Sequence, residues 1–258
     1  MKSRIRTSLL LIGGVVCVIQ AGVAQADGIL YFSRDGDSET SGLYSLDTEN
    51  GAATRLGVSG VTSATVGLAE GRNADVLYGS KWAGLLEINS DGSGWDDRGG
   101  VGNEGLAYDV ENEVLYGAIN GRFRTIDPAT GNIILALISP GVDIEGLAYA
   151  DGYVYGLARG EMGLYRYDVA EKEWMVVGST GILWDLVGLG YDSSTQTLYA
   201  KGRQSMNLYA INPGTASTRT IGSTGIAEGG GLAFVVPEPT TVVLLAFGGF
   251  AALRRRLN

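Results

Sequence analysis

The chain has 258 residues, with 41 glycines and 13 tyrosines against only 5 prolines. These proportions are typical of many short strands joined by tight turns, and they argue against a helical or a disordered chain. The sequence has no histidine and a single cysteine, Cys17, which excludes a disulfide framework and leaves no His or Cys set for zinc binding or catalysis.

The first 26 residues have the three parts of a secretory signal peptide. Lys2, Arg4 and Arg6 form a basic start, and residues 8–19 form a short apolar stretch. Ala24 and Ala26 then provide a small-x-small cleavage site before Asp27. We therefore predict cleavage after Ala26; the alternative, a retained membrane anchor, is disfavoured because the apolar stretch is short.

The segment that follows is strongly acidic. Residues 27–235 carry 13 basic and 27 acidic side chains, a formal net charge of −14. Such a surface repels nucleic acid and anionic lipid, so we predict no nucleic-acid partner.

A repeat runs through residues 27–235. A Gly-Leu-(Ala/Gly) element begins at five glycines separated by 38, 41, 42 and 43 residues, namely Gly67, Gly105, Gly146, Gly188 and Gly231. This period is typical of a four-stranded propeller blade.

Three further elements complete each unit. A second element carries an aromatic residue, as in ILYFS, VLYGS, VLYGA, YVYGL and TLYAK. A third alternates and ends in Asp or Asn, at Asp47, Asn89, Asp127, Asp168 and Asn212. We expect these last side chains to start tight turns by accepting backbone hydrogen bonds. A fourth strand follows, as in ATRLG and WMVVG.

The repeat is offset between the two ends of the segment. The first unit, residues 28–60, has no Gly-Leu-Ala strand, and residues 231–235 supply a single one at the end. The two fragments make one blade, and such a closure removes exposed sheet edges. We predict an all-β fold, a β-propeller of five four-stranded blades closed by the C-terminal strand. The repeats resemble generic propeller sequences of the WD40 or NHL kind; other blade counts and other all-β forms remain as alternatives.

Five acidic residues lie at or near the junctions that enter the Gly-Leu-Ala strands. Glu104 and Glu145 immediately precede their glycines, and Asp143, Asp185 and Glu228 lie three residues before theirs. We predict that these carboxylates surround one mouth of the central channel, where a cation or a sugar would bind; the alternative is that they are solvated loop residues. We predict no cofactor, because no motif specifies one. Calcium suits the acids chemically, but RDGDSET, the nearest approach to a calcium loop, lacks the expected Gly and Glu.

The C-terminal 23 residues, 236–258, form a third segment. Pro237, Glu238 and Pro239 precede an apolar run over residues 240–253, which we predict to be a transmembrane helix in the inner membrane. Arg254, Arg255 and Arg256 follow as a basic stop. The order of these parts resembles the PEP-CTERM sorting signal of Gram-negative bacteria. The resemblance implies processing by an exosortase-type membrane enzyme, display at the cell surface or release, and a link to exopolysaccharide and biofilm.

From these features we predict an exported, membrane-anchored precursor that becomes a surface-associated or secreted binding or matrix protein. A polysaccharide or another surface protein is the expected ligand. We predict that the protein is not an enzyme. Two alternatives remain: a polysaccharide-acting enzyme that uses carboxylates alone, and a purely structural envelope protein.

Overall fold

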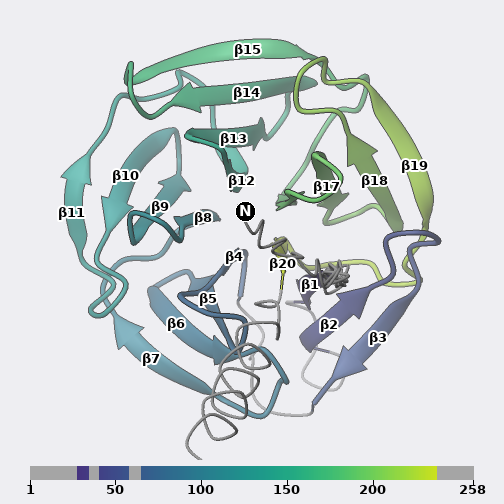
Figure 1. Cartoon of the computed structure of the whole chain (residues 1–258), viewed down its shortest axis with the longest axis horizontal. Helices are drawn as coiled ribbons and strands as arrows, with labels where there is room; N and C mark the ends of the chain where they lie inside the picture. Colours follow the sequence, from purple (N-terminus) through teal and green to yellow (C-terminus); the bar gives the residue numbers. More distant parts are fainter. Residues whose placement is uncertain (1–27, 35–40, 58–64, 237–258) are drawn as a thin grey trace, which may run out of the picture. The chain divides into compact units, whose positions relative to one another are not determined.

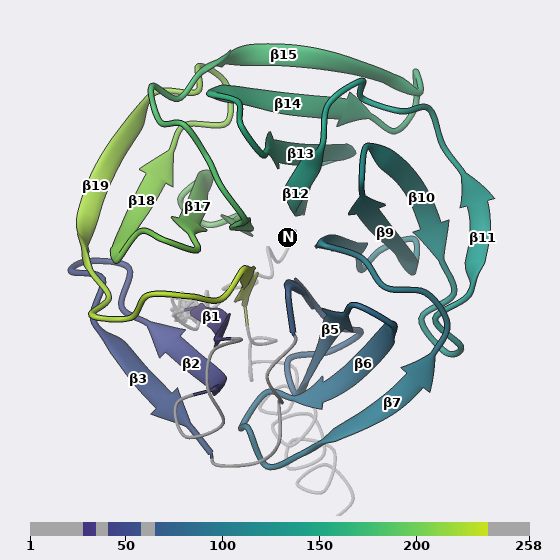
Figure 2. The same ribbon diagram turned by 180° about the vertical axis from the view of Figure 1, so that it is seen from behind.

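The computed structural model describes residues 28–34, 41–57 and 65–236. Its twenty strands form five separate four-stranded antiparallel sheets, arranged as the blades of a ring (Figures 1 and 2). The fold predicted from the repeat, a five-blade β-propeller, is confirmed. Within the described residues, no helix is long and apolar enough to span a membrane.

Each blade runs from an inner strand beside the channel to an outer strand at the rim. Blade 1 contains β20 (Gly231–Val235), β1 (Ile29–Arg34), β2 (Gly42–Leu46) and β3 (Ala53–Leu56). Blade 2 contains β4 (Gly67–Glu70), β5 (Val76–Lys81), β6 (Gly84–Asn89) and β7 (Trp95–Gly99). Blade 3 contains β8 (Gly105–Asp109), β9 (Val114–Ile119), β10 (Arg122–Ile126) and β11 (Ile133–Ala136). Blade 4 contains β12 (Ile144–Ala150), β13 (Tyr153–Ala158), β14 (Gly163–Asp168) and β15 (Glu173–Ser179). Blade 5 contains β16 (Val187–Asp192), β17 (Thr197–Gly202), β18 (Asn207–Ile211) and β19 (Thr218–Ser223).

Blade 1 joins the two ends of the propeller segment. β20 pairs with β1 in antiparallel register, with Phe32 opposite Leu232 and Tyr31 opposite Ala233. β20 also contacts the inner strands on both sides, β16 and β4. The ring is therefore closed by the last strand, as the offset of the repeat predicts, and β1 is paired on both sides, with β20 and with β2.

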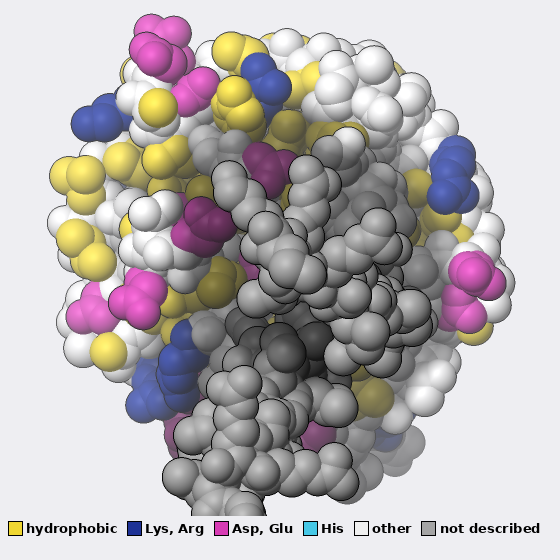
Figure 3. All heavy atoms as spheres, in the orientation of Figure 1, with side chains coloured by type: hydrophobic (Ala, Val, Ile, Leu, Met, Phe, Trp, Pro, Cys, Tyr) yellow, Lys and Arg dark blue, Asp and Glu magenta, His cyan; other side chains and the backbone are white. Residues whose placement is uncertain are grey.

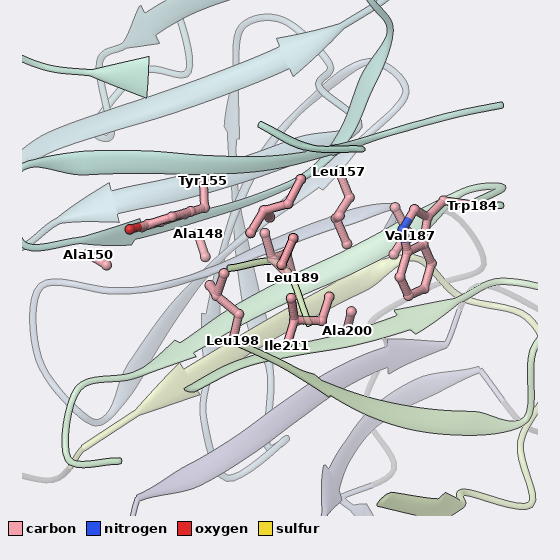
Figure 4. Packing of buried hydrophobic residues seen from close by; sticks show 12 residues of the cluster. Ala148, Ala150, Tyr155, Leu157, Trp184, Val187, Leu189, Leu198, Ala200 and Ile211 are labelled. Atoms are coloured by element: carbon pink, nitrogen blue, oxygen red, sulfur yellow. The ribbon is translucent and has the colours of Figure 1, made fainter. Parts of the chain in front are cut away.

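The hydrophobic core lies between neighbouring blades. Each of five clusters of buried side chains combines residues from two adjacent sheets. In the cluster between blades 4 and 5, Leu157 packs with Leu189 and Ile211, and Trp184 closes one end (Figure 4). The apolar faces of every sheet are thus buried against the next sheet, which is the stabilisation that holds a ring without disulfides.

The glycine of each Gly-Leu-Ala element is required by the close approach of the inner strands. A Cβ atom on Gly146 would lie 2.6 Å from the carbonyl oxygen of Val187 in the next blade. A Cβ on Gly105 would lie 2.9 Å from the carbonyl oxygen of Glu145. Because these contacts are with backbone, they cannot be relieved by a side-chain rotation, so five inner strands fit around one channel only without a Cβ at this position.

The turns after the third strands follow the predicted hydrogen bonding in four blades. The side chains of Asp47, Asp127, Asp168 and Asn212 each accept a hydrogen bond from the backbone N–H two residues later. Blade 2 differs: Asn89 donates to the Ser93 hydroxyl, and Asp91 accepts the Ser93 N–H instead. The connection is no longer than the others, since Ile88 pairs with Trp95 as Leu46 pairs with Ala53, so blade 2 differs only in which side chain accepts the turn's backbone N–H.

The outer strands are the most exposed. All four residues of β11 are exposed, including Ile133, Ile134 and Leu135. Hydrophobic side chains gather at the rim over this strand in the surface view (Figure 3).

Candidate functional site

The two mouths of the channel are formed by opposite ends of the inner strands. Residues just before the Gly-Leu-Ala glycines lie at one mouth, and the residues that end the inner strands, such as Glu70 and Val235, lie at the other. We call Glu104, Asp143 and Glu145 the acidic triad and describe it first.

The acidic triad brings together carboxylates from two neighbouring blades. One carboxylate oxygen from each residue lies within 4.8 Å of the other two. Glu104 precedes β8, whereas Asp143 and Glu145 lie at the start of β12. Glu145 is the extra residue of a β-bulge, because Ile144 pairs with Ala158 and Gly146 pairs with Leu157. Bulges of this kind redirect a side chain and are frequent beside functional sites.

Two members of the triad are held by one hairpin turn. The Asn120 N–H donates to Glu104 Oε2 at 3.3 Å, and the Gly121 N–H donates to Asp143 Oδ1 at 2.8 Å. Asn120 and Gly121 have φ angles of 49° and 68°, and they form the two-residue connection between β9 and β10. Positive φ at both positions is the geometry of a tight hairpin turn, and it directs these two amides at the acids.

Glu145 is the most deeply buried member. Its side chain is 1% exposed, and its Oε1 accepts no hydrogen bond in the described structure. Arg159 Nη1 lies 3.9 Å from that oxygen, but the Arg159 side chain is 61% exposed. Burial, followed by repulsion from Glu104 and Asp143, raises the pKa of Glu145 to about 8. Burial also raises the pKa of Glu104.

The other two predicted acids have different surroundings. Asp185 uses both carboxylate oxygens to accept the N–H groups of Arg203 and Gln204, at 3.0 and 2.9 Å. Glu228 has a side chain that is 46% exposed and lies 3.6 Å from Arg34 in an ion pair. The structure therefore brings three of the five predicted acids together, and the other two hold loops.

The opposite mouth contains a cavity that the sequence reasoning missed. Its volume is about 450 Å³, and we call it the tyrosine cavity. Its lining includes three aromatic residues and several hydrogen-bonding side chains, namely Tyr149, Tyr191, Phe234, Glu70, Asn73, Glu111, Asp151 and Ser193.

The polar side chains of the tyrosine cavity differ in the hydrogen bonds that they already make within the protein. The Tyr191 hydroxyl donates to Asp151 Oδ2 at 3.3 Å. Arg72 also lines the cavity, but its guanidinium makes two hydrogen bonds to Glu87, at 2.7 and 2.8 Å. Burial, with a smaller contribution from Asp109, raises the pKa of Glu70 to about 7. The cavity therefore presents carboxyl, hydroxyl and amide groups, and the cation that lines it in the described part of the chain, Arg72, is paired.

A signal for this cavity was present in the repeat. Tyr149, Tyr191 and Phe234 each stand three residues after a Gly-Leu-(Ala/Gly) glycine, the position that Glu70 occupies in blade 2. Tyr108 has the same position in blade 3 but is buried against Tyr78, with ring centroids 5.1 Å apart. The repeat thus identifies this sequence position in each blade, but it does not show in which blades the side chain lines the cavity.

Two tryptophans outside the strands differ in exposure. Trp184 is 3% exposed, and its indole N–H donates to the Thr180 hydroxyl at 3.0 Å, so it belongs to the core. Trp82 is 55% exposed and does not line the tyrosine cavity.

The fold and the two mouths together define a five-blade propeller with different chemistry at each end of its channel. Residues 235–256 match the PEP-CTERM protein-sorting motif. The motif indicates export, with a membrane-anchored precursor that is sorted to the cell surface. The predicted sorting residues Pro237 to Pro239 and Arg254 to Arg256, the transmembrane run 240–253 and the cleavage residues Ala24 and Ala26 lie outside the described residues.

The solved structures that are similar to this chain are distant in sequence. A chain in the crystal structure of a nidogen–laminin complex is similar with a TM-score of 0.56 and 14% identity, over 80% of this chain and 82% of that one. Glutaminyl cyclase from Myxococcus xanthus has a TM-score of 0.46 and 18% identity, over 72% of this chain and 74% of that one. These similarities concern the fold alone. No curated protein matches the chain.

Proposed function

We propose that the protein is a surface-displayed binding protein whose ligand is a neutral extracellular polysaccharide. The observation that carries this proposal is the tyrosine cavity. Its volume of about 450 Å³ falls in the range of ligand sites. The partly exposed rings of Tyr149 and Tyr191 suit the apolar faces of sugar rings, and the carboxyl and amide groups around them suit sugar hydroxyls. Phe234 is 7% exposed and stacks on Tyr199, so it forms the floor of the cavity rather than a free face.

Charge favours a neutral polysaccharide over an acidic one. Glu70, Glu111 and Asp151 line the cavity, and Arg72, the only cation among the described residues that line it, is bound to Glu87. Residues 27–235 also carry a formal net charge of −14, which repels polyanions. In this proposal the sorting motif places the propeller, after processing by an exosortase-type enzyme, where exopolysaccharide of a biofilm is present.

The test uses residues 27–236, which contain all twenty strands of the closed ring. This domain is titrated with the neutral and the acidic fractions of the host's secreted polysaccharide, and binding is followed by affinity electrophoresis and calorimetry. We expect saturable binding of the neutral fraction. Tyr191→Ala should weaken binding by about tenfold or more, since one aromatic contact contributes about 1–3 kcal/mol.

Trp82→Ala is the matched control, because Trp82 is exposed and lies outside the cavity. Its binding should equal that of the wild type. Loss of binding in Trp82→Ala with normal binding in Tyr191→Ala would reject the cavity as the site. No saturable binding of any fraction would support the structural envelope role instead.

A second function, a polysaccharide-acting enzyme, is favoured by one observation. Glu70, with a pKa of about 7, shares the cavity with Glu111 and Asp151, and glycosidases use one protonated and one ionised carboxyl group. An enzyme would release reducing ends from the bound fraction, and Glu70→Gln would abolish that release without weakening binding. We propose the binding role because Tyr191 already engages Asp151, so that carboxylate serves as a fixed hydrogen-bond acceptor.

A further inference from the structure

The spacing of the acidic triad matches the space that one divalent cation occupies. One oxygen from each of Glu104, Asp143 and Glu145 lies within 4.8 Å of the others. Two oxygens on opposite sides of a calcium ion, each at about 2.4 Å, are about 4.8 Å apart. Three carboxylates this close repel one another when ionised, so a cation between them would remove the repulsion.

An independent observation at Glu145 points to a missing ligand. The residue is 2% exposed, and its Oε1 has no hydrogen-bond partner in the described structure. Among the residues that the structure describes, the cation paired with it is Arg159, 3.9 Å away on a side chain that is 61% exposed. A buried carboxylate oxygen without a partner is costly, and such groups in proteins are normally paired or coordinate a metal.

The other two carboxylates are prepared for the same role. Asp143 Oδ1 and Glu104 Oε2 accept backbone N–H groups of the Asn120-Gly121 turn. No other hydrogen bond is recorded for the second oxygen of either residue among the described parts of the chain. Outer hydrogen bonds of this kind orient metal-binding carboxylates before the metal arrives.

The propeller fold does not require acids at these positions. The residue before the Gly-Leu-(Ala/Gly) glycine is Val66 in blade 2, Val187 in blade 5 and Gly230 in blade 1. Glu104 and Glu145 are the corresponding residues of blades 3 and 4, and the carbonyl of each contacts the glycine of the preceding blade as that of Val187 does. The carbonyl contact at this position is therefore common to these blades, whereas an acidic side chain occurs there only in the adjacent blades 3 and 4.

We propose that Glu104, Asp143 and Glu145 bind a divalent cation at this mouth, and that the cation is Ca²⁺. Three carboxylates with no nitrogen or sulfur donor suit a hard cation. Calcium accepts an irregular set of oxygens completed by water, whereas Mg²⁺ demands near-octahedral geometry and dehydrates reluctantly, which disfavours contact with the buried Glu145. This proposal does not depend on polysaccharide binding, because the tyrosine cavity lies at the other mouth.

The test is calorimetric titration of chelator-treated residues 27–236 with CaCl₂, with thermal unfolding measured in parallel. We expect one saturable site with a dissociation constant near 10⁻⁴ to 10⁻³ M, the range of extracellular calcium modules, and a rise in Tm with calcium concentration. MgCl₂ should bind at least about tenfold more weakly.

Two variants of Glu145 make the result decisive. Glu145→Gln and Glu145→Val should each weaken calcium binding by about tenfold or more, because removal of even an outer-shell partner has effects of that size. Glu145→Val introduces the residue that blades 2 and 5 already carry at this position, so it retains the fold. Glu228→Gln, an acid ion-paired with Arg34, is the control and should bind like the wild type.

Two results would overturn the proposal. One is the absence of a saturable calcium signal and of any Tm shift up to about 10 mM CaCl₂, well above the expected dissociation constant. The other is calcium binding that is equal in the wild type and in folded Glu145→Val, which would place the ion elsewhere.

Discussion

Glu70 makes the stability of the propeller depend on pH, and Glu70→Gln should remove that dependence. Glu70 ends β4 and lines the tyrosine cavity. Burial, followed by repulsion from Asp109, raises its pKa from 4.5 to about 7. In the unfolded chain the carboxyl group is hydrated and has its ordinary pKa, so the folded protein binds one proton more between these two values.

This difference in proton binding sets the direction and the size of the change in unfolding free energy with pH. Between pH 4.5 and about 7 the folded state holds the Glu70 proton and the unfolded state does not, so the free energy of unfolding falls as pH rises. The loss is complete above about pH 7. A rise in the pKa from 4.5 to about 7 corresponds to at most about 3.5 kcal/mol of unfolding free energy.

The assay is urea unfolding of residues 27–236 at pH 5, 6, 7 and 8 in the presence of a chelator. Glutamine is neutral at every pH, so Glu70→Gln should be more stable than the wild type by under about 1 kcal/mol at pH 5 and by up to about 3 kcal/mol at pH 8. The raised pKa of Glu145 is present in both proteins and cancels in their difference. Glu171→Gln, which changes an exposed carboxylate in the β14–β15 turn, is the control and should show no such trend.

A difference between Glu70→Gln and the wild type that stays constant from pH 5 to pH 8 would refute the reasoning. So would a difference that grows toward low pH, because it would mean that the folded state stabilises the ionised carboxylate. The slope of unfolding free energy against urea concentration must be equal in the two proteins for the comparison to hold.

Three further predictions concern the ring itself. Gly146→Ala places a Cβ 2.6 Å from the Val187 carbonyl and should cost about 1–3 kcal/mol, seen as a Tm lowered by roughly 3–10 °C, whereas Gly94→Ala, with its nearest atom 3.6 Å away, should change Tm little. Deletion of residues 231–258 removes β20 and leaves β1 unpaired on its inner side, so circular dichroism should show no cooperative melt, while a chain that ends at residue 236 should melt like the domain. Trp184→Phe removes the hydrogen bond to Thr180 in the core between blades 4 and 5 and should lower the free energy of unfolding by about 1–3 kcal/mol in urea; no change would mean that the Thr180 hydroxyl finds other partners.

The fold could be predicted because its signals are local and repeated. The spacing of the Gly-Leu-(Ala/Gly) elements predicted the five blades. The first unit lacks its first strand, and residues 231–235 supply it, which predicted how the ring closes. The role of Asp or Asn after the third strand was also readable, because Asp47 and its counterparts bond to residues two positions away. Asn89 departs from this pattern because Asp91 accepts the backbone N–H of this turn and Asn89 donates to Ser93 instead, and the sequence alone did not show which of the two polar residues would be the acceptor.

The candidate sites were less predictable because they depend on contacts between blades. The sequence placed Glu104, Asp143 and Glu145 at one mouth, but only the docking of blade 3 on blade 4 brings their oxygens within 4.8 Å. Asp185 has a similar sequence context, yet both of its oxygens are used by the β17–β18 turn. Whether a loop carboxylate faces a backbone amide or another carboxylate is set by distant residues, which no local pattern encodes.

The backbone contacts of the inner strands recur around the ring, whereas the acidic side chains do not. This difference separates structural residues from functional ones. Gly105 and Gly146 meet a backbone carbonyl of the next blade in the same way, so their contacts belong to the ring. The buried carboxylates of Glu104 and Glu145 occur in two adjacent blades only, where Val66 and Val187 serve the same backbone purpose elsewhere. A fold that needs these positions only for their backbone leaves the side chains free to carry chemistry. Glu145, buried and without a hydrogen bond to its Oε1, is therefore the residue at which the proposed cation would offset the cost of burial.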